Sequence, residues 1–172
     1  MPYVYSNNYH SAYTNTIPNP GGENEIIMFK SCFPNSEVGT SINDEKAIYN
    51  HIKLYFAAHP NKLFVLITSP GTAHVSSYKL TQELCNWLVD KNGWLNGYKG
   101  KNVFVFDFYG VLSEINSHHR YYNGQIEHVY ATNYDGNSPY HDGDDHPNAI
   151  GNQKATNEFI SLLNIAYNHW KV

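Results

Sequence analysis

The sequence predicts an α/β domain in which helices lie on both faces of a short parallel sheet, a three-layer α/β/α arrangement. Three short apolar runs in the chain are typical of strands buried on both faces. The segments that follow the first two runs carry apolar residues at helical spacing. Regular alternation of strands and helices favours a parallel sheet over an antiparallel one.

The three apolar runs define the expected strands. They are Ile26–Phe29, Leu63–Thr68 and Val103–Asp107. We expect them to be parallel and to lie next to one another or nearly so. The first run is closed by Pro34, and the second by Pro70 and Gly71.

Three helices are expected around this sheet. The first begins with Asn43 as its N-cap and ends at His59-Pro60, because the residue before a proline disfavours the helical conformation. The second begins near Thr81 and ends at Asn92-Gly93. The last carries an apolar stripe made of Phe159, Leu162, Leu163, Ala166 and Trp170.

Two segments have no clear period. Residues 1–22 are rich in Asn, Tyr, Ser, Thr, Pro and Gly and predict an irregular lead-in, so the single domain spans residues 23–172. Residues 109–152 are rich in His, Tyr, Asn, Asp and Gly and are expected to form one long functional loop.

Composition excludes several classes of function. Only 15% of the residues are charged, the net charge is −4, and there is no run of Lys and Arg, so a nucleic-acid partner is not expected. The longest apolar run is too short to span a membrane. No secretory signal peptide is visible, and the sequence assigns no cellular compartment. Two cysteines do not make a disulfide framework.

The predicted topology places a functional site at one edge of the sheet. Ligands of parallel α/β sheets bind beyond the carboxyl ends of the strands. Three segments occupy these ends, namely Lys30-Ser31, Thr68-Ser69-Pro70 and Asp107 with the loop after it. The architecture therefore draws attention to Ser31.

The most informative stretch precedes the last helix. Asp144 lies two residues before His146, in a turn that contains Gly143 and Pro147. A carboxylate so placed can orient an imidazole and stabilise its charged form, as in the base half of a nucleophile–His–acid triad. The alternative is a solvated acidic loop formed by Asp142, Asp144 and Asp145.

The pattern Asp144-x-His146-Pro147-Asn148-x-x-Gly151 resembles the C-terminal block of the SGNH (GDSL-type) esterases and lipases. The order of strands and helices over residues 23–172 is similar to that family too. The resemblance implies a flavodoxin-like fold that hydrolyses a carboxylic ester without a cofactor. Asp144 and His146 would then be the acid and the base, and the substrate a small ester, with an acylated carbohydrate as one option.

The sequence departs from the family in two places. No Gly-Asp-Ser block is present, and Gly143 stands three residues before His146, where the family has its acid. The run from Met28 to Ser36 takes the place of the family's Gly-x-Asn-Asp block, since two further strands follow it. The chain thus looks divergent or truncated at its N-terminus.

Ser31 therefore has three interpretations. It is the nucleophile with His146 as its base, or an oxyanion donor, a role that Asn35 could take instead, or a hydroxyl that satisfies a turn. Lys30 also has alternative interpretations: a base beside Ser31, a contact to the oxyanion or substrate, or a solvated charge. Asn148 is assigned to substrate binding. Cys32 is an alternative nucleophile, although a free cysteine is more often a small core residue.

A metal site is not expected. The histidines lack metal-binding spacing, and the adjacent side chains of His118 and His119 should point apart.

The competing hypothesis is a non-catalytic domain of the same fold. It would bind a carbohydrate or a protein through the aromatic loop at residues 118–141. If the first strands of the family are missing, the Glu25–Phe29 edge is exposed, and a homodimer through this edge is expected.

Overall fold

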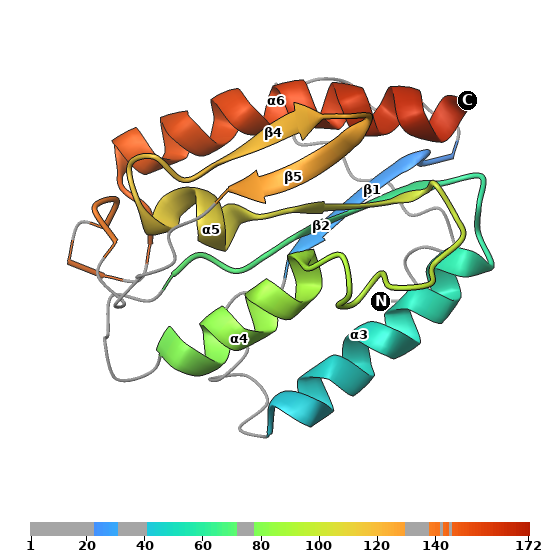
Figure 1. Cartoon of the computed structure of the whole chain (residues 1–172), viewed down its shortest axis with the longest axis horizontal. Coiled ribbons are helices and arrows are strands. Elements are labelled where there is room, and N and C mark those ends of the chain that lie inside the picture. Colours follow the sequence, from blue (N-terminus) through green and yellow to red (C-terminus); the bar gives the residue numbers. More distant parts are fainter. Residues whose placement is uncertain (1–22, 31–40, 72–77, 130–137, 142, 145) are drawn as a thin grey trace.

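A computed structural model of the chain describes residues 23–30, 41–71, 78–129, 138–141, 143–144 and 146–172. It is a mixed α/β structure that contains a three-stranded parallel sheet (Figure 1). The elements in chain order are β1 (Ile26–Lys30), α3 (Ile42–Ala57), β2 (Leu63–Ile67), α4 (Tyr78–Val89), β3 (Val103–Phe106), α5 (Phe108–Ser113), β4 (His118–Tyr122), β5 (Gln125–Val129) and α6 (Ala149–Lys171).

The three predicted strands form one sheet in the order β1-β2-β3. Both pairings are parallel, with Met28 opposite Val65 and Val65 opposite Phe104. The prediction of parallel, adjacent strands is therefore confirmed. Long connections that carry α3 and α4 join the strands, as parallel pairing requires.

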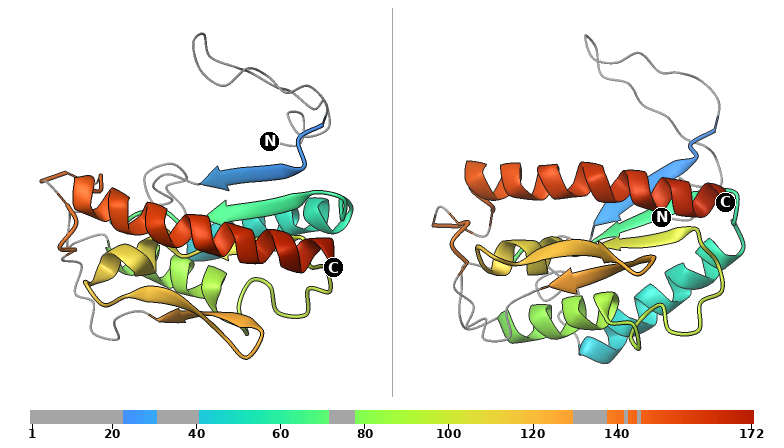
Figure 2. Two further views of the ribbon diagram at one scale, coloured as in Figure 1. Left: turned by 90° about the horizontal axis from the view of Figure 1, so that it is seen from above. Right: turned by 45° about the horizontal axis from the view of Figure 1, so that its top comes forward.

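Alternate side chains of the strands build two hydrophobic clusters. Leu63 and Val65 of β2 belong to a cluster with residues of α5 and α6, among them Leu162. Phe64 and Leu66 belong to a second cluster with α3, α4 and the fully buried Trp94. Figures 1 and 2 show α6 on one side of the sheet and α3 with α4 on the other.

Both long helices on the second side begin earlier than the sequence predicts. Ser41, not Asn43, is the N-cap of α3, because the Asp44 carboxylate accepts hydrogen bonds from the Ser41 backbone N–H (3.3 Å) and hydroxyl (2.8 Å). α4 begins at Tyr78 instead of near Thr81.

The prediction of one long loop over residues 109–152 is wrong for a large part of that segment. α5 and an antiparallel hairpin formed by β4 and β5 lie within it. Asn123 and Gly124 join the two strands, and both have positive φ values, 49° and 77°. Two-residue hairpins favour turns of this kind, and Asn-Gly is their strongest sequence signal.

One face of β1 is poorly covered. Ile26 is 37% exposed and Met28 is 53% exposed, whereas Ile27 is buried between them. The lead-in at residues 1–22 lies outside the described residues. None of the described helices is long and apolar enough to cross a membrane.

Candidate functional site at the carboxyl edge of the sheet

The loop before α6 lies at the carboxyl ends of the parallel strands. The C-terminal end of α6 is tied to the opposite edge, where the Trp170 indole N–H donates to the Pro60 carbonyl and Lys171 pairs with Glu25. α6 therefore runs antiparallel to the sheet, and its N-terminus lies at the edge where β1, β2 and β3 end (Figure 1).

Asp144 and His146 contact each other within this loop. The His146 backbone N–H donates to Asp144 Oδ1 at 2.8 Å, and the same oxygen lies 3.3 Å from His146 Nδ1. The hydrogen bond from the His146 backbone, followed by the His146 side chain, holds the pKa of Asp144 below its usual range. Asp144 is therefore ionised at neutral pH and can orient the imidazole. Both side chains are largely exposed, at 70% and 73%.

Backbone contacts shape this loop. A bridge joins His141 to Pro147, and the Asn148 N–H donates to the Tyr140 carbonyl at 2.6 Å. The Tyr140 side chain is buried in the cluster beneath α6. Gly143 has a φ of 87°, a conformation that L residues rarely adopt. Asp144 and His146 are therefore carried by a short loop anchored at one end by a core aromatic residue.

Two residues of the sequence motif have structural roles here. The Asn148 side-chain oxygen accepts the Gly151 N–H at 2.9 Å, so Asn148 is the N-cap of α6. A Cβ atom at Gly151 would lie 2.8 Å from Cβ of Tyr140, so only glycine allows this approach. These contacts account for both residues without a substrate, although Asn148 was assigned to substrate binding.

Of the other predicted site residues, Lys30 is among the described residues and the rest are not. Lys30 ends β1, and its side chain is exposed at the carboxyl edge. Ser31, Cys32 and Asn35 lie outside the described residues, as do Asp142 and Asp145, so their positions relative to His146 stay predictions.

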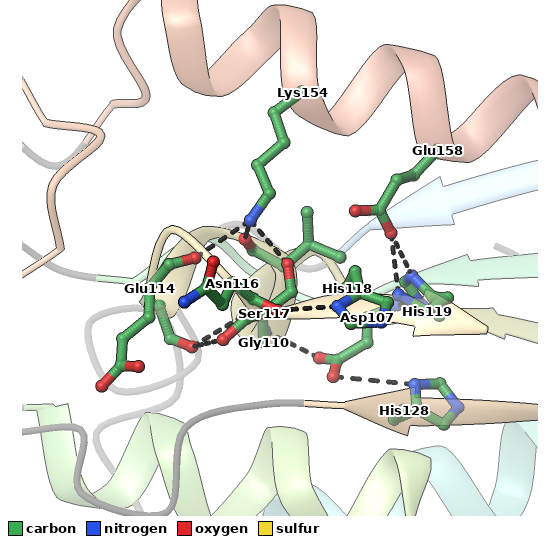
Figure 3. Close-up of polar contacts among 12 residues, drawn as sticks. Asp107, Gly110, Glu114, Asn116, Ser117, His118, His119, His128, Lys154 and Glu158 are labelled. Atoms are coloured by element: carbon green, nitrogen blue, oxygen red, sulfur yellow. Dashed lines mark hydrogen bonds and ion pairs between the residues drawn. The ribbon is translucent and has the colours of Figure 1, made fainter.

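A second set of acids and histidines lies at the end of β3, and the sequence analysis did not identify it (Figure 3). The His119 side chain is only 1% exposed, and both ring nitrogens have partners. Nε2 accepts the Asp107 backbone N–H at 3.0 Å, and Nδ1 lies 3.0 Å from Glu158 Oε2. Because Nε2 is an acceptor, the ring is the neutral tautomer that donates from Nδ1 to Glu158.

Asp107 connects this contact to a second histidine. Asp107 Oδ1 accepts the Gly110 N–H at 2.9 Å and caps α5. Asp107 Oδ2 lies 3.6 Å from His128 Nδ1, beyond hydrogen-bond distance. His119 is on β4 and His128 on β5, so the hairpin is tied to the end of β3 by the His119 hydrogen bond, and the His128 ring lies near the same aspartate.

α6 supplies the charged groups that complete the network. Burial raises the pKa of Glu158, but the hydrogen bonds from His119 and the charge of Lys154 outweigh it, so that the pKa lies below its usual range. Burial lowers the pKa of Lys154. The Lys154 ammonium donates to three carbonyls, those of Val111, Glu114 and Ser117, and so satisfies the C-terminal end of α5.

Neither cysteine chemistry nor metal binding is favoured by the described residues. Burial raises the pKa of the Cys85 thiol to about 12, which leaves it protonated and inert at neutral pH. Among the residues that the structure describes, no group of three or more His, Cys, Asp or Glu side chains is placed to hold a metal ion. His118 is exposed and His119 buried, as expected for neighbours on a strand.

A comparison of the chain with protein-family models, with curated proteins and with solved structures finds no match.

Proposed function

We propose that this chain hydrolyses a carboxylic ester, with His146 as the general base and Asp144 as the residue that orients it. The observation that carries the proposal is the 3.3 Å contact between Asp144 Oδ1 and His146 Nδ1 at the carboxyl edge of the sheet. With Nδ1 held by the carboxylate, Nε2 is the ring nitrogen that takes the proton from the nucleophile.

Ser31 completes the proposed mechanism. In the sequence it directly follows Lys30, the last residue of β1, and β1 ends at the edge that carries the Asp144–His146 pair. In one form of the proposal Ser31 attacks the ester carbonyl. In the other it donates to the oxyanion, a role for which Asn35 is the alternative. The proposed fold type is the flavodoxin-like one of the SGNH hydrolases, and the chemistry requires no cofactor.

The proposal is tested with chromogenic esters of acetate, butyrate, octanoate and laurate. The wild type should release the chromophore faster than buffer, and His146→Ala should lose about 100- to 10,000-fold in kcat/KM, the range for a general base. His51→Ala, an exposed histidine on α3, is the matched control and should keep full activity. A wild type that is inactive on all four esters contradicts the proposal.

Ser31→Ala separates the two roles of Ser31. Loss of a nucleophile should remove all activity that depends on His146. Loss of one oxyanion donor should lower kcat about 100- to 1,000-fold, and the remaining activity should still require His146.

A non-catalytic binding domain is the second candidate. It is favoured by the exposure of Asp144 and His146, because a catalytic acid is usually shielded from water. Tyr121 and Tyr122, each 56% exposed on the hairpin, offer aromatic surface for a sugar or a protein. Affinity electrophoresis in gels with soluble polysaccharides tests this candidate. Retardation that Tyr122→Ala abolishes, in a chain without esterase activity, would favour it.

The partner proposed for β1 is a second copy of the chain. In the β1–β2 ladder the peptide groups of Ile27 and Phe29 face β2, so those of Ile26, Met28 and Lys30 face the outer edge. Antiparallel pairing of two copies would then place Met28 opposite its own counterpart. Sedimentation at micromolar concentration should show a dimer that Met28→Lys converts to monomer, and a monomeric wild type contradicts the proposal.

A further inference from the structure

A groove runs between β3 and the β4–β5 hairpin. It consists of two cavities, of about 470 Å³ and about 250 Å³. Both are lined by Leu95, Val103, Phe104 and Ile126, so they adjoin and form parts of one groove. The larger cavity alone has the size of a small-molecule site.

The groove exists because, among the strands that the structure describes, β3 has a partner on one edge only. β2 pairs with one edge, and β5 belongs to a separate two-stranded sheet with β4. The hairpin is held near the carboxyl end of β3 by His119, which accepts the Asp107 backbone N–H. Towards the amino end of β3, the space between Val103 and Ile126 is open, and Ile165 of α6 forms another wall.

The charges around the groove are asymmetric. Lys101 and His169, both exposed, lie at the larger cavity, and none of the residues that line this cavity is Asp or Glu. Lys101 makes no ion pair with a described residue. The smaller cavity has both Asp90 and Lys91 in its lining. An anionic group is therefore favoured at the larger cavity and an uncharged chain in the rest of the groove.

We propose that this groove binds an unbranched aliphatic monocarboxylate. The hydrocarbon tail lies on Leu95, Val103, Phe104 and Ile126, and the carboxylate lies beside Lys101 and His169. Burial of each methylene favours binding, and the lysine provides the opposite charge. The inference does not depend on ester hydrolysis, because the groove lies along the outer edge of β3 whereas Lys30 ends β1 at the other edge of the sheet.

The test is calorimetric titration of the full chain with decanoate below its micellar concentration. Saturable binding at one site is expected, and affinity should rise about tenfold from octanoate to decanoate as two methylenes are buried. Decyltrimethylammonium, which has the same tail and the opposite charge, should bind at least fivefold more weakly than decanoate.

Two variants localise the ligand. Lys101→Gln should weaken decanoate about two- to fivefold, the effect of an exposed ion pair. Lys99→Gln, an exposed lysine outside the groove lining, is the matched control and should bind as the wild type does. Ile165→Trp fills the larger cavity and should reduce decanoate binding at least tenfold, with the melting temperature measured to show that the variant is folded.

The outcomes separate this proposal from the previous one. His146→Ala should bind decanoate as the wild type does, whether or not the chain is an esterase. Absence of saturable decanoate binding overturns the proposal. It is also overturned if a folded Ile165→Trp variant binds decanoate normally, or if Lys99→Gln and Lys101→Gln behave alike.

Discussion

Two of the carboxylate–histidine contacts among the described residues are similar in length but lie in opposite surroundings. Glu158 Oε2 lies 3.0 Å from His119 Nδ1, and Asp144 Oδ1 lies 3.3 Å from His146 Nδ1. The first histidine is almost fully buried, whereas the second is mostly exposed. Distance alone therefore does not distinguish a structural pair from one available to a substrate.

The surroundings decide what each pair can do. Both nitrogens of His119 are occupied, by Glu158 and by the Asp107 N–H, so this ring joins three elements and has no nitrogen left for a substrate. Water screens the Asp144–His146 pair, which therefore adds little to stability but remains accessible. The buried imidazole therefore links secondary-structure elements, whereas the exposed imidazole stays accessible to a ligand.

The largest expected effect that sharpens this contrast is on stability. His119→Ala removes a buried ring and its two contacts. The Asp107 N–H loses its acceptor, and Glu158 loses its contact with the ring. The free energy of unfolding should fall by about 3 kcal/mol, because ring packing and two buried hydrogen bonds are lost; urea denaturation measures this. His146→Ala should denature as the wild type does. Equal loss of stability in the two variants would contradict the distinction.

The pH dependence of stability should follow Glu158. Its folded pKa is lowered relative to the unfolded chain, so its contribution is present above the unfolded pKa, about 4.3, and is lost as pH falls through the folded pKa. Glu158→Gln should cost about 1–2 kcal/mol at pH 7 and progressively less below about pH 4. Urea denaturation at pH 7, 5, 4 and 3 measures this difference, and a constant difference would be the contrary result.

Asp144→Asn tests the exposed pair directly. The amide no longer stabilises the imidazolium, and kcat for ester hydrolysis should fall about tenfold, less than for a buried triad acid because water screens the charge. Thermal denaturation should show an unchanged melting temperature. A variant that loses stability but keeps kcat would reverse the roles of the two pairs.

The smallest expected effect concerns Asn148. Loss of the N-cap in Asn148→Ala should lower the free energy of unfolding by about 1 kcal/mol, and Asn148→Asp should restore most of it because aspartate is an equally good cap. KM for an ester should be unchanged in both variants. A raised KM at unchanged stability would restore the substrate-binding role that the sequence suggested.

Local patterns and the pairing of the apolar strands were predictable, whereas long-range polar contacts were not. The strands follow from uninterrupted apolar runs such as Leu63–Ile67, and the Asp144–His146 contact joins residues only two positions apart. Glu158 is 39 residues from His119, and no periodicity connects them. The hairpin had a usable signal in Asn123-Gly124, which was hidden by the polar composition of the flanking strands.

The position of α6 has a consequence for how the chain is made. The apolar face of the sheet that includes Leu63 and Val65 packs on α6, which leaves the ribosome after all three strands. The strands are synthesised in the order in which they lie in the sheet, β1, β2 and then β3. The sheet can therefore assemble before α6 has emerged to cover it. Until residue 171 has emerged, this face is open to aggregation or to a chaperone. Nascent chains stalled within residues 149–171 should therefore be the most chaperone-dependent species in the biogenesis of this protein.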